Sequence, residues 1–306
     1  MTTTAKRTAS LRASSEDSAE NSTVKWSQER RLQFIDFRLQ WEGRINRKDV
    51  TEFFKISVPQ ASADLALYQH LMPDNMRYDT STRMYVANQH FKPRSDTSGA
   101  RQYLSQLLAL HRGILTGDQA FLSFNPPMES VPLPARSLDA STLLPLIQAT
   151  ADRGKLMVKY QSISRDEAPG RFISPHAFGY DGIRWHVRAY CEIRRGFRDF
   201  VLGRILSTEQ PQATDIKSTD DLDWHQYVDL VLKPDPTLSQ AQRRGIERDY
   251  AMKNGTSTVT CRKAMLFYTL RTLNFEIDGV PRSGEKQLVI ANLAEIKPML
   301  PSFGQA

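Results

Sequence analysis

The chain has 306 residues, more than one hydrophobic core usually serves, so two or three domains are expected. A composition of 25% charged and 40% hydrophobic residues, with only two cysteines, excludes a mostly disordered, collagen-like or disulfide-framed protein. The 41 basic and 34 acidic residues give a net charge of +7, which permits a polyanionic partner. Because no apolar run suits a membrane span or a secretory segment, we expect a cytoplasmic protein without membrane contact.

The N-terminal third predicts a tail followed by a small helical domain. Residues 1–24 are rich in Ser, Thr and Ala and almost lack large apolar side chains, which indicates a disordered tail. Residues 25–92 follow the order helix, helix, helix, hairpin. Asn46 and Ser57 are suitable N-caps for the second and third helices, and two extended runs between Met76 and Val86 indicate the hairpin. This order predicts a winged helix-turn-helix.

The rest of the chain predicts a linker and two further domains. Residues 93–136 combine an amphipathic helix with four prolines between residues 126 and 134, which predicts a helical linker. Residues 137–215 predict a small α+β domain, whose short strands suggest a barrel. Its elements are a helix over 141–153 and strands over 156–162, 170–173, 176–180, 183–191 and 197–205. Residues 221–306 predict a C-terminal domain with helices near 239–250 and 263–273 and strands at 257–261 and 287–291.

The third predicted helix has the side chains of a DNA-reading helix. One face is apolar, whereas the other carries small or amide-bearing residues, which let a helix approach base edges. Cations on the preceding helix, the turn and the hairpin suit phosphate contacts. The candidate DNA-binding residues are Arg47, Lys48, Lys55, Ser57, Gln60, Ser62, Ala63, Arg77 and Arg83. The alternative is an ordinary three-helix unit with a solvated basic face.

A second group of candidates lies between residues 171 and 204, which contain seven Arg and no Lys. Strand alternation places His186, Arg188 and Tyr190 on one face, and Arg198 and Arg204 share one parity in the next strand. Arginines with interleaved aromatic rings suit a nucleotide or single-stranded nucleic acid. The alternative is a solvated sheet face on which Arg198 pairs with a neighbouring acid.

These residues carry a resemblance to a known family. The runs Trp185-His186-Val187-Arg188-Ala189-Tyr190-Cys191, Phe197-Arg198-Asp199-Phe200 and Gly203-Arg204-Ile205 resemble the WYL domain. The family is named for a Trp-Tyr-Leu triplet, and His186 and Val187 stand here in place of Tyr and Leu. The resemblance implies an Sm-like β-barrel that senses a ligand. It also implies ligand-binding residues, which are Ser174, His176, His186, Arg188, Tyr190, Arg198 and Arg204.

The whole domain order is similar to that of WYL transcriptional regulators. The run from Pro59 to Leu65, Tyr78-Asp79 and Thr260-Cys261-Arg262-Lys263 look like the WYL repressors encoded beside bacterial anti-phage systems. This resemblance implies a homodimer with a small α/β C-terminal dimerisation domain. It also implies an inverted-repeat duplex DNA operator of a phage-defence operon, and release by a nucleotide or nucleic-acid effector. An activator of the same layout, for example one responsive to DNA damage, and an RNA- or single-strand-binding module are the alternatives.

No catalytic role is expected. The sequence contains no nucleophile elbow, no metalloprotease helix and no phosphate-binding glycine-rich loop. Cys191 and Cys261 stand in no metal-ligand spacing. We therefore expect neither an enzyme nor a bound metal or cofactor.

Overall fold

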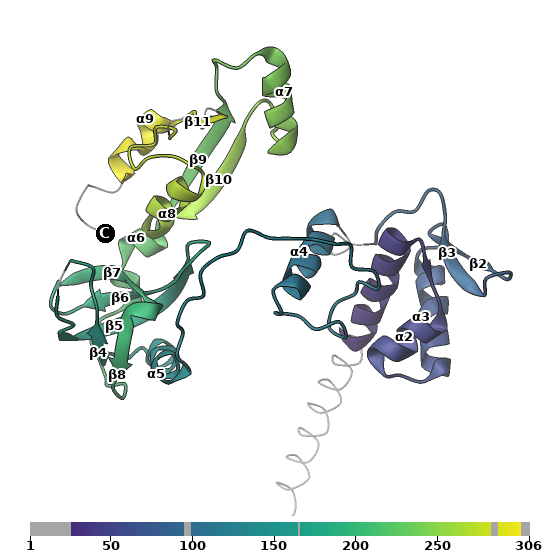
Figure 1. Ribbon diagram of the computed structural model, residues 1–306, viewed down its shortest axis with the longest axis horizontal. Coiled ribbons are helices and arrows are strands. Elements are labelled where there is room, and N and C mark those ends of the chain that lie inside the picture. Colours follow the sequence, from purple (N-terminus) through teal and green to yellow (C-terminus); the bar gives the residue numbers. More distant parts are fainter. Residues whose placement is uncertain (1–25, 95–98, 165, 283–286, 301–306) are drawn as a thin grey trace, which may run out of the picture. The chain divides into compact units, whose positions relative to one another are not determined.

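The computed structural model describes residues 26–94, 99–164, 166–282 and 287–300 (Figure 1). The tail predicted for residues 1–24 lies outside this range. The chain divides into two compact units with the boundary between Pro132 and Leu133, and each unit is described by itself. Within the described ranges, no helix combines the length and apolar character needed to cross a membrane.

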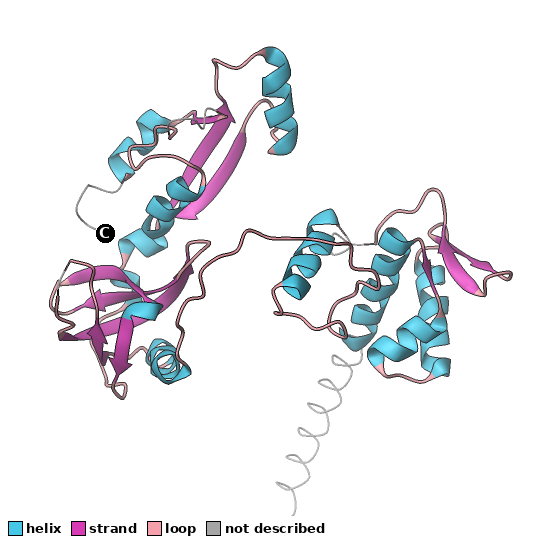
Figure 2. Cartoon of the chain, viewed as in Figure 1, coloured by secondary structure: helices cyan, strands magenta, loops and turns pink. Residues whose placement is uncertain are grey.

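The first unit has the predicted helix, helix, helix, hairpin order, which confirms the winged helix-turn-helix. A helix over residues 26–42 leads into β1 (Arg44–Ile45), α2 (Arg47–Phe54) and α3 (Val58–Leu71). The wing consists of β2 (Met76–Asp79) and β3 (Met84–Ala87). Together with β1, the two wing strands form an antiparallel sheet in the order β1-β3-β2 (Figure 2).

Local sequence sets the turn between α2 and α3. Asn46 and Asp49 form a capping box that starts α2, and Ser57 caps α3 through a bond from the Gln60 N–H to its hydroxyl. Lys55 ends α2 in the left-handed conformation, at φ 54°. The two helices are therefore joined by only three residues, 55–57.

Buried polar side chains tie α3 to the helix over 26–42. Arg31 pairs with Asp64 at 2.6 Å (Nε to Oδ2), and the Tyr68 hydroxyl donates to Asp36 at 2.5 Å. Asn75 donates to the Tyr68 oxygen at 3.0 Å. Burial and the bond to Asp36 raise the pKa of Tyr68 far above its usual value, so its hydroxyl stays a donor. Sequence periodicity gave no sign of this network inside the apolar core.

The segment predicted as a helical linker contains α4 (Ala100–His111), which packs within the first unit. The ring of Tyr103 stacks on Phe37 at 6.0 Å between centroids, and Ala120 and Leu122 complete this cluster. Residues 124–139 then carry neither helix nor strand. Of the predicted linker, only the stretch after residue 123 therefore connects the two units.

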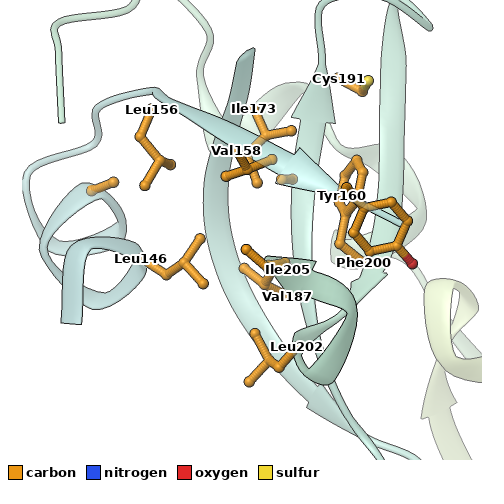
Figure 3. Close-up of a cluster of buried hydrophobic side chains, with 12 residues drawn as sticks. Leu146, Leu156, Val158, Tyr160, Ile173, Val187, Cys191, Phe200, Leu202 and Ile205 are labelled. Atoms are coloured by element: carbon orange, nitrogen blue, oxygen red, sulfur yellow. The ribbon is translucent and has the colours of Figure 1, made fainter. Parts of the chain in front are cut away.

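The second unit begins with α5 (Ala140–Ala151) and a five-stranded antiparallel sheet in the order β7-β6-β5-β4-β8. Its strands are β4 (Leu156–Tyr160), β5 (Gly170–Tyr180), β6 (Trp185–Cys191), β7 (Gly196–Val201) and β8 (Ile205–Thr208). Figure 3 shows Leu146 of α5 pointing toward a core that includes Val158 and Val187. This architecture corresponds to the predicted small α+β domain.

Two expectations for this sheet need correction. The Sm-like barrel is not confirmed, because β7 and β8 are the two edges of the sheet in the described chain. They are joined by the 3₁₀ helix η2 (Leu202–Arg204), after which β8 pairs with β4. The strands predicted over 170–173 and 176–180 are one strand, β5, because pairing with β6 continues across an irregularity between Pro175 and Ala177.

The C-terminal part folds around β9 (Tyr227–Pro234), which the sequence reading did not identify. It lies between β10 (Ser257–Arg262) and β11 (Leu288–Ile290) in an antiparallel sheet. The helices are α6 (Leu222–His225), α7 (Gln240–Asp249), α8 (Leu266–Thr272) and α9 (Leu293–Ile296). Burial alternates along β9, and its inward side chains Val228, Leu230 and Leu232 are almost fully buried.

Replacing Tyr68 with Phe should lower the free energy of unfolding of the first unit by about 1.5–3 kcal/mol, because a bond to a buried carboxylate is lost. Urea denaturation of the full chain measures the change. Tyr78→Phe is the matched control, since Tyr78 is exposed on β2. Equal stability of the two variants would contradict the role given to the Tyr68–Asp36 bond.

Candidate nucleic-acid interface and effector site

Helix α3 presents a narrow, solvent-facing stripe of small side chains. Pro59, Ala63 and Ala66 are exposed, whereas Ala61 and Leu65 are fully buried against the rest of the unit. Small side chains on the outer face allow the backbone of such a helix to approach the floor of a DNA groove. His70, at the far end of the helix, is also exposed and was not among the predicted residues.

The predicted phosphate-binding cations all lie at the surface of the first unit. These exposed residues are Arg47, Lys48, Lys55, Arg77 and Arg83. Lys48 has an exposed carboxylate, that of Glu52, at 3.6 Å, a contact too weak to keep the ammonium from a phosphate. In the wing, the Ser81 hydroxyl and N–H donate to Asp79, which lowers the pKa of that carboxyl and shapes the turn beside Arg83.

Three of the predicted polar contacts are already engaged inside the helix. The Ser57 hydroxyl accepts from the Gln60 N–H at 3.4 Å, and the Ser62 hydroxyl donates to the Val58 carbonyl at 2.9 Å. The Gln60 amide donates to Asp64 at 3.2 Å, beside the buried Arg31 pair. The exposed Ala63 therefore offers the freest surface for a base edge, and Gln60 has its amide orientation set by the core.

The register of β6 and β7 separates the two arginines that were expected to share a surface. Arg188 lies opposite Asp199, whereas Arg198 lies opposite Ala189. Because Ala189 faces the hydrophobic core, Arg188 and Arg198 belong to opposite faces of the sheet. The interpretation of both strands as one cationic surface is therefore wrong.

His176 reaches the face of Arg188 because of a bulge in β5. Pro175 pairs with Ala189 and Ala177 pairs with Arg188, so His176 is the extra residue between two regular pairs. A bulge of this kind changes the direction of one side chain without ending the strand. The His176 ring consequently packs edge-on against Phe197 and Trp224, at 5.4 and 5.8 Å between ring centroids.

Asp221 binds both His176 and Arg188. Arg188 donates from Nε to Oδ2 at 2.7 Å and from Nη2 to Oδ1 at 3.0 Å, and His176 Nε2 lies 2.9 Å from Oδ2. Arg188 Nη1 also donates to Asp199 at 3.3 Å. All four side chains are largely buried. We call these four residues the Asp221 cluster.

The charges of the cluster depend on one another. Burial opposes ionisation of Asp221, but the bonds from His176 and Arg188 hold its pKa far below the usual range. For Asp199, burial prevails and raises the pKa despite Arg188. Burial also opposes the charge of Arg188, yet its two carboxylate partners raise its pKa. Asp221 is therefore the main anionic partner of Arg188 in this structure.

His186 belongs to an adjoining group of hydrogen bonds. Its Nε2 lies 3.0 Å from Asp181 Oδ2, and its ring lies 4.8 Å from that of Tyr268 between centroids. Although burial acts in the other direction, bonds from His186 and from backbone N–H groups lower the pKa of Asp181 to about 2. Tyr268 donates to Asp199 at 3.2 Å. Two residues of the C-terminal part, Asp221 and Tyr268, thus complete a site on the β5–β6 sheet face.

The remaining predicted ligand residues are dispersed. Ser174 is buried with its hydroxyl 3.3 Å from that of Thr214, and Tyr190 packs against Phe197. Arg204 lies at η2 and lines a separate hollow with Arg184. The structure thus brings His176, His186 and Arg188 together and places Arg198 and Arg204 elsewhere. Asp221 was missed because it stands in a loop with no periodicity or motif to mark it.

Three family models match successive parts of the chain. They describe the BrxR transcriptional regulator winged helix-turn-helix domain over residues 27–109 and the WYL domain over residues 141–210. The third describes the BrxR transcriptional regulator C-terminal dimerization domain over residues 227–296. The three matches correspond to the winged helix, the α5–β8 sheet domain and the β9-centred sheet.

Curated relatives match over nearly the whole chain. The DNA-binding transcriptional repressor CapW of Stenotrophomonas maltophilia is 46% identical over 285 residues, which is 92% of this chain and 95% of that protein. CapW of Pseudomonas aeruginosa is 42% identical and CapW of Escherichia coli 40%, each over 280 residues, 90% of this chain and 93% of the relative. The chain therefore belongs to the WYL-domain transcriptional regulators of the CapW and BrxR type.

Proposed function

We propose that the protein is a dimeric, sequence-specific DNA-binding transcriptional repressor. The observation that carries this function is the exposed small-residue stripe of α3, with Lys55 in the turn before it and Arg77 and Arg83 on the wing. The small side chains suit a major groove and the cations suit the phosphates beside it. The family matches support the same assignment, since the relatives are named as DNA-binding repressors.

The C-terminal match to a dimerisation domain supports a homodimer. A twofold dimer presents two recognition helices, so its operator is an inverted repeat with half-sites about 10–10.5 base pairs apart or a multiple of that spacing. The resemblance to repressors beside anti-phage systems favours a phage-defence operon as the controlled gene set.

Release from DNA is proposed to follow binding of a nucleotide or nucleic-acid effector at the WYL domain. The Asp221 cluster supports this proposal, because it connects the WYL sheet to the C-terminal domain. Arg188 and His176 are on the sheet, while Asp221 is the N-cap of α6, which contacts the β10 side of the C-terminal domain. Arg262 of β10 also donates to the Trp224 carbonyl in α6. For release, the effector must bind one dimer arrangement more tightly than the other.

Loss of the gene should raise transcription from the promoter that the protein controls, because repression is removed. A reporter fused to the upstream region, compared between the deletion strain and a complemented strain, measures this. A fall in output in the deletion strain would identify an activator instead.

Neutralising one phosphate-binding cation should weaken operator binding and its salt dependence together. Lys55→Gln removes one cation per protomer from the turn between α2 and α3, so the slope of log affinity against log salt should decrease by about 1.8 per dimer, at about 0.9 per phosphate. Fluorescence anisotropy with the promoter duplex over a salt series gives the slope. Lys217→Gln, an exposed lysine of the second unit, is the control. An unchanged slope in Lys55→Gln would contradict the contact.

Asp221→Asn should lower the free energy of unfolding by about 3 kcal/mol, because Arg188 loses the nearer of its two charged partners while the amide oxygen still accepts one bond. Asp223→Asn on the same helix is the control, since Asp223 is half exposed. Because the folded pKa of Asp221 lies below its unfolded value of about 3.9, its stabilisation is complete at neutral pH and declines below pH 4. Denaturation at pH 7 and pH 3 should therefore show a smaller difference between the variant and wild type at pH 3.

A further inference from the structure

The second unit contains a hollow of about 230 Å³ that includes no member of the Asp221 cluster. It lies among three segments: the end of the connecting stretch, the β5–β6 turn, and η2 with the preceding Val201. Its lining consists of Ala135, Arg136, Ser137, Leu138, Ile183, Arg184, Trp185, Val201, Gly203 and Arg204. No acidic residue lines it in the described chain.

The polar part of the hollow is cationic. Arg136, Arg184 and Arg204 line it, and only Arg184 has an acidic partner within the described residues, Asp181 at 3.3 Å from its Nε. The terminal nitrogens of all three guanidinium groups remain for a ligand. Three arginines that have only one acidic partner among the described residues suit a phosphate, which they can bind through pairs of N–H donors.

The rest of the lining is largely apolar and includes an exposed aromatic ring, that of Trp185. Trp185 is 45% exposed, beside the similarly exposed Ile183 and Leu138. The Trp185 ring also contacts that of Tyr180, at 4.9 Å between centroids, which limits its rotation. An exposed indole beside arginines is an arrangement that stacks a nucleobase and holds its phosphate.

The size of the hollow limits the ligand. Pockets that enclose a drug-sized ligand measure about 300–1,000 Å³, and this one has about 230 Å³. It therefore accommodates no more than one nucleotide unit, and the rest of a longer ligand lies outside.

We propose that this hollow binds a nucleotide unit, with the base on Trp185 and the phosphate on Arg136, Arg184 and Arg204. The proposal rests on the proposed function and assigns the effector a position outside the Asp221 cluster. Free mononucleotide and single-stranded DNA present the same unit, and the experiment separates these two sources.

The position of Arg136 links the proposed site to the stretch that joins the two units. Arg136 stands four residues after Pro132, where the first unit ends. A Cβ atom at Gly203 would come within 2.9 Å of the Ser137 carbonyl oxygen, so the connecting stretch is seated tightly on η2. A phosphate bound by Arg136 together with Arg184 and Arg204 fastens this stretch to the WYL sheet.

The test is an anisotropy titration of a fluorescein-labelled, 5′-phosphorylated pentathymidylate with the full-length protein, followed by competition with TMP and with inorganic phosphate. Arg136→Gln should weaken binding at least about tenfold, the effect of one lost charge-assisted bond. Trp185→Leu should do the same, and Gly203→Ala should weaken binding without removing a charge. Arg194→Gln is the matched control, an exposed arginine in the β6–β7 turn.

Because the winged helix also attracts oligonucleotides, each titration is repeated in the Lys55→Gln chain, where the effect of Arg136→Gln should persist. Competition by TMP identifies a mononucleotide site, and competition by unlabelled pentathymidylate alone identifies a strand site. Equal competition by inorganic phosphate would overturn the stacking role of Trp185. Wild-type affinity in Arg136→Gln, or no probe binding by a protein that still binds its promoter duplex, would overturn the site and leave the repressor function standing.

Discussion

The organisation of the second unit depends on one buried carboxylate. Arg188 and His176 sit on a sheet face that is closed to solvent, and a guanidinium in such a place needs an anion close by. Asp221 supplies that anion from outside the sheet, at 2.7 Å from Arg188 and 2.9 Å from His176. Since Asp221 also caps α6, the ion pair joins the WYL sheet to the helix that precedes the C-terminal domain.

The same constraint explains why family ligand residues are not all available to a ligand here. His176, His186 and Arg188 already have carboxylate partners within the chain, so an incoming anion would have to displace one of them. Arg204 and Arg184, in contrast, face an open hollow. The WYL domain thus combines an internally satisfied polar site with a second cationic surface on the side of the connecting stretch.

The sequence was sufficient for the elements with local signals. Asn46 and Ser57 marked helix starts, and both are N-caps in the structure. The sequence did not predict the register in which distant strands pair. A bulge at His176 and the Arg188–Asp199 register depend on how strands meet, and one shift of a single residue moves a side chain to the other face. Asp64 and Asp221 were missed for a related reason, since a buried acid is marked only by its distant partner.

The hydrogen bond between Gln60 and Asp64 has a consequence for substitutions in α3. Asp64 also pairs with Arg31 in the core, so exchanging the side chain at position 60 removes one hydrogen bond to the acid of an internal ion pair. Ala63 and Ala66 make no such internal bond, because their methyl groups face solvent. On the proposed DNA-reading face, substitutions at positions 63 and 66 therefore carry little structural cost, whereas a substitution at position 60 removes a bond to a buried acid.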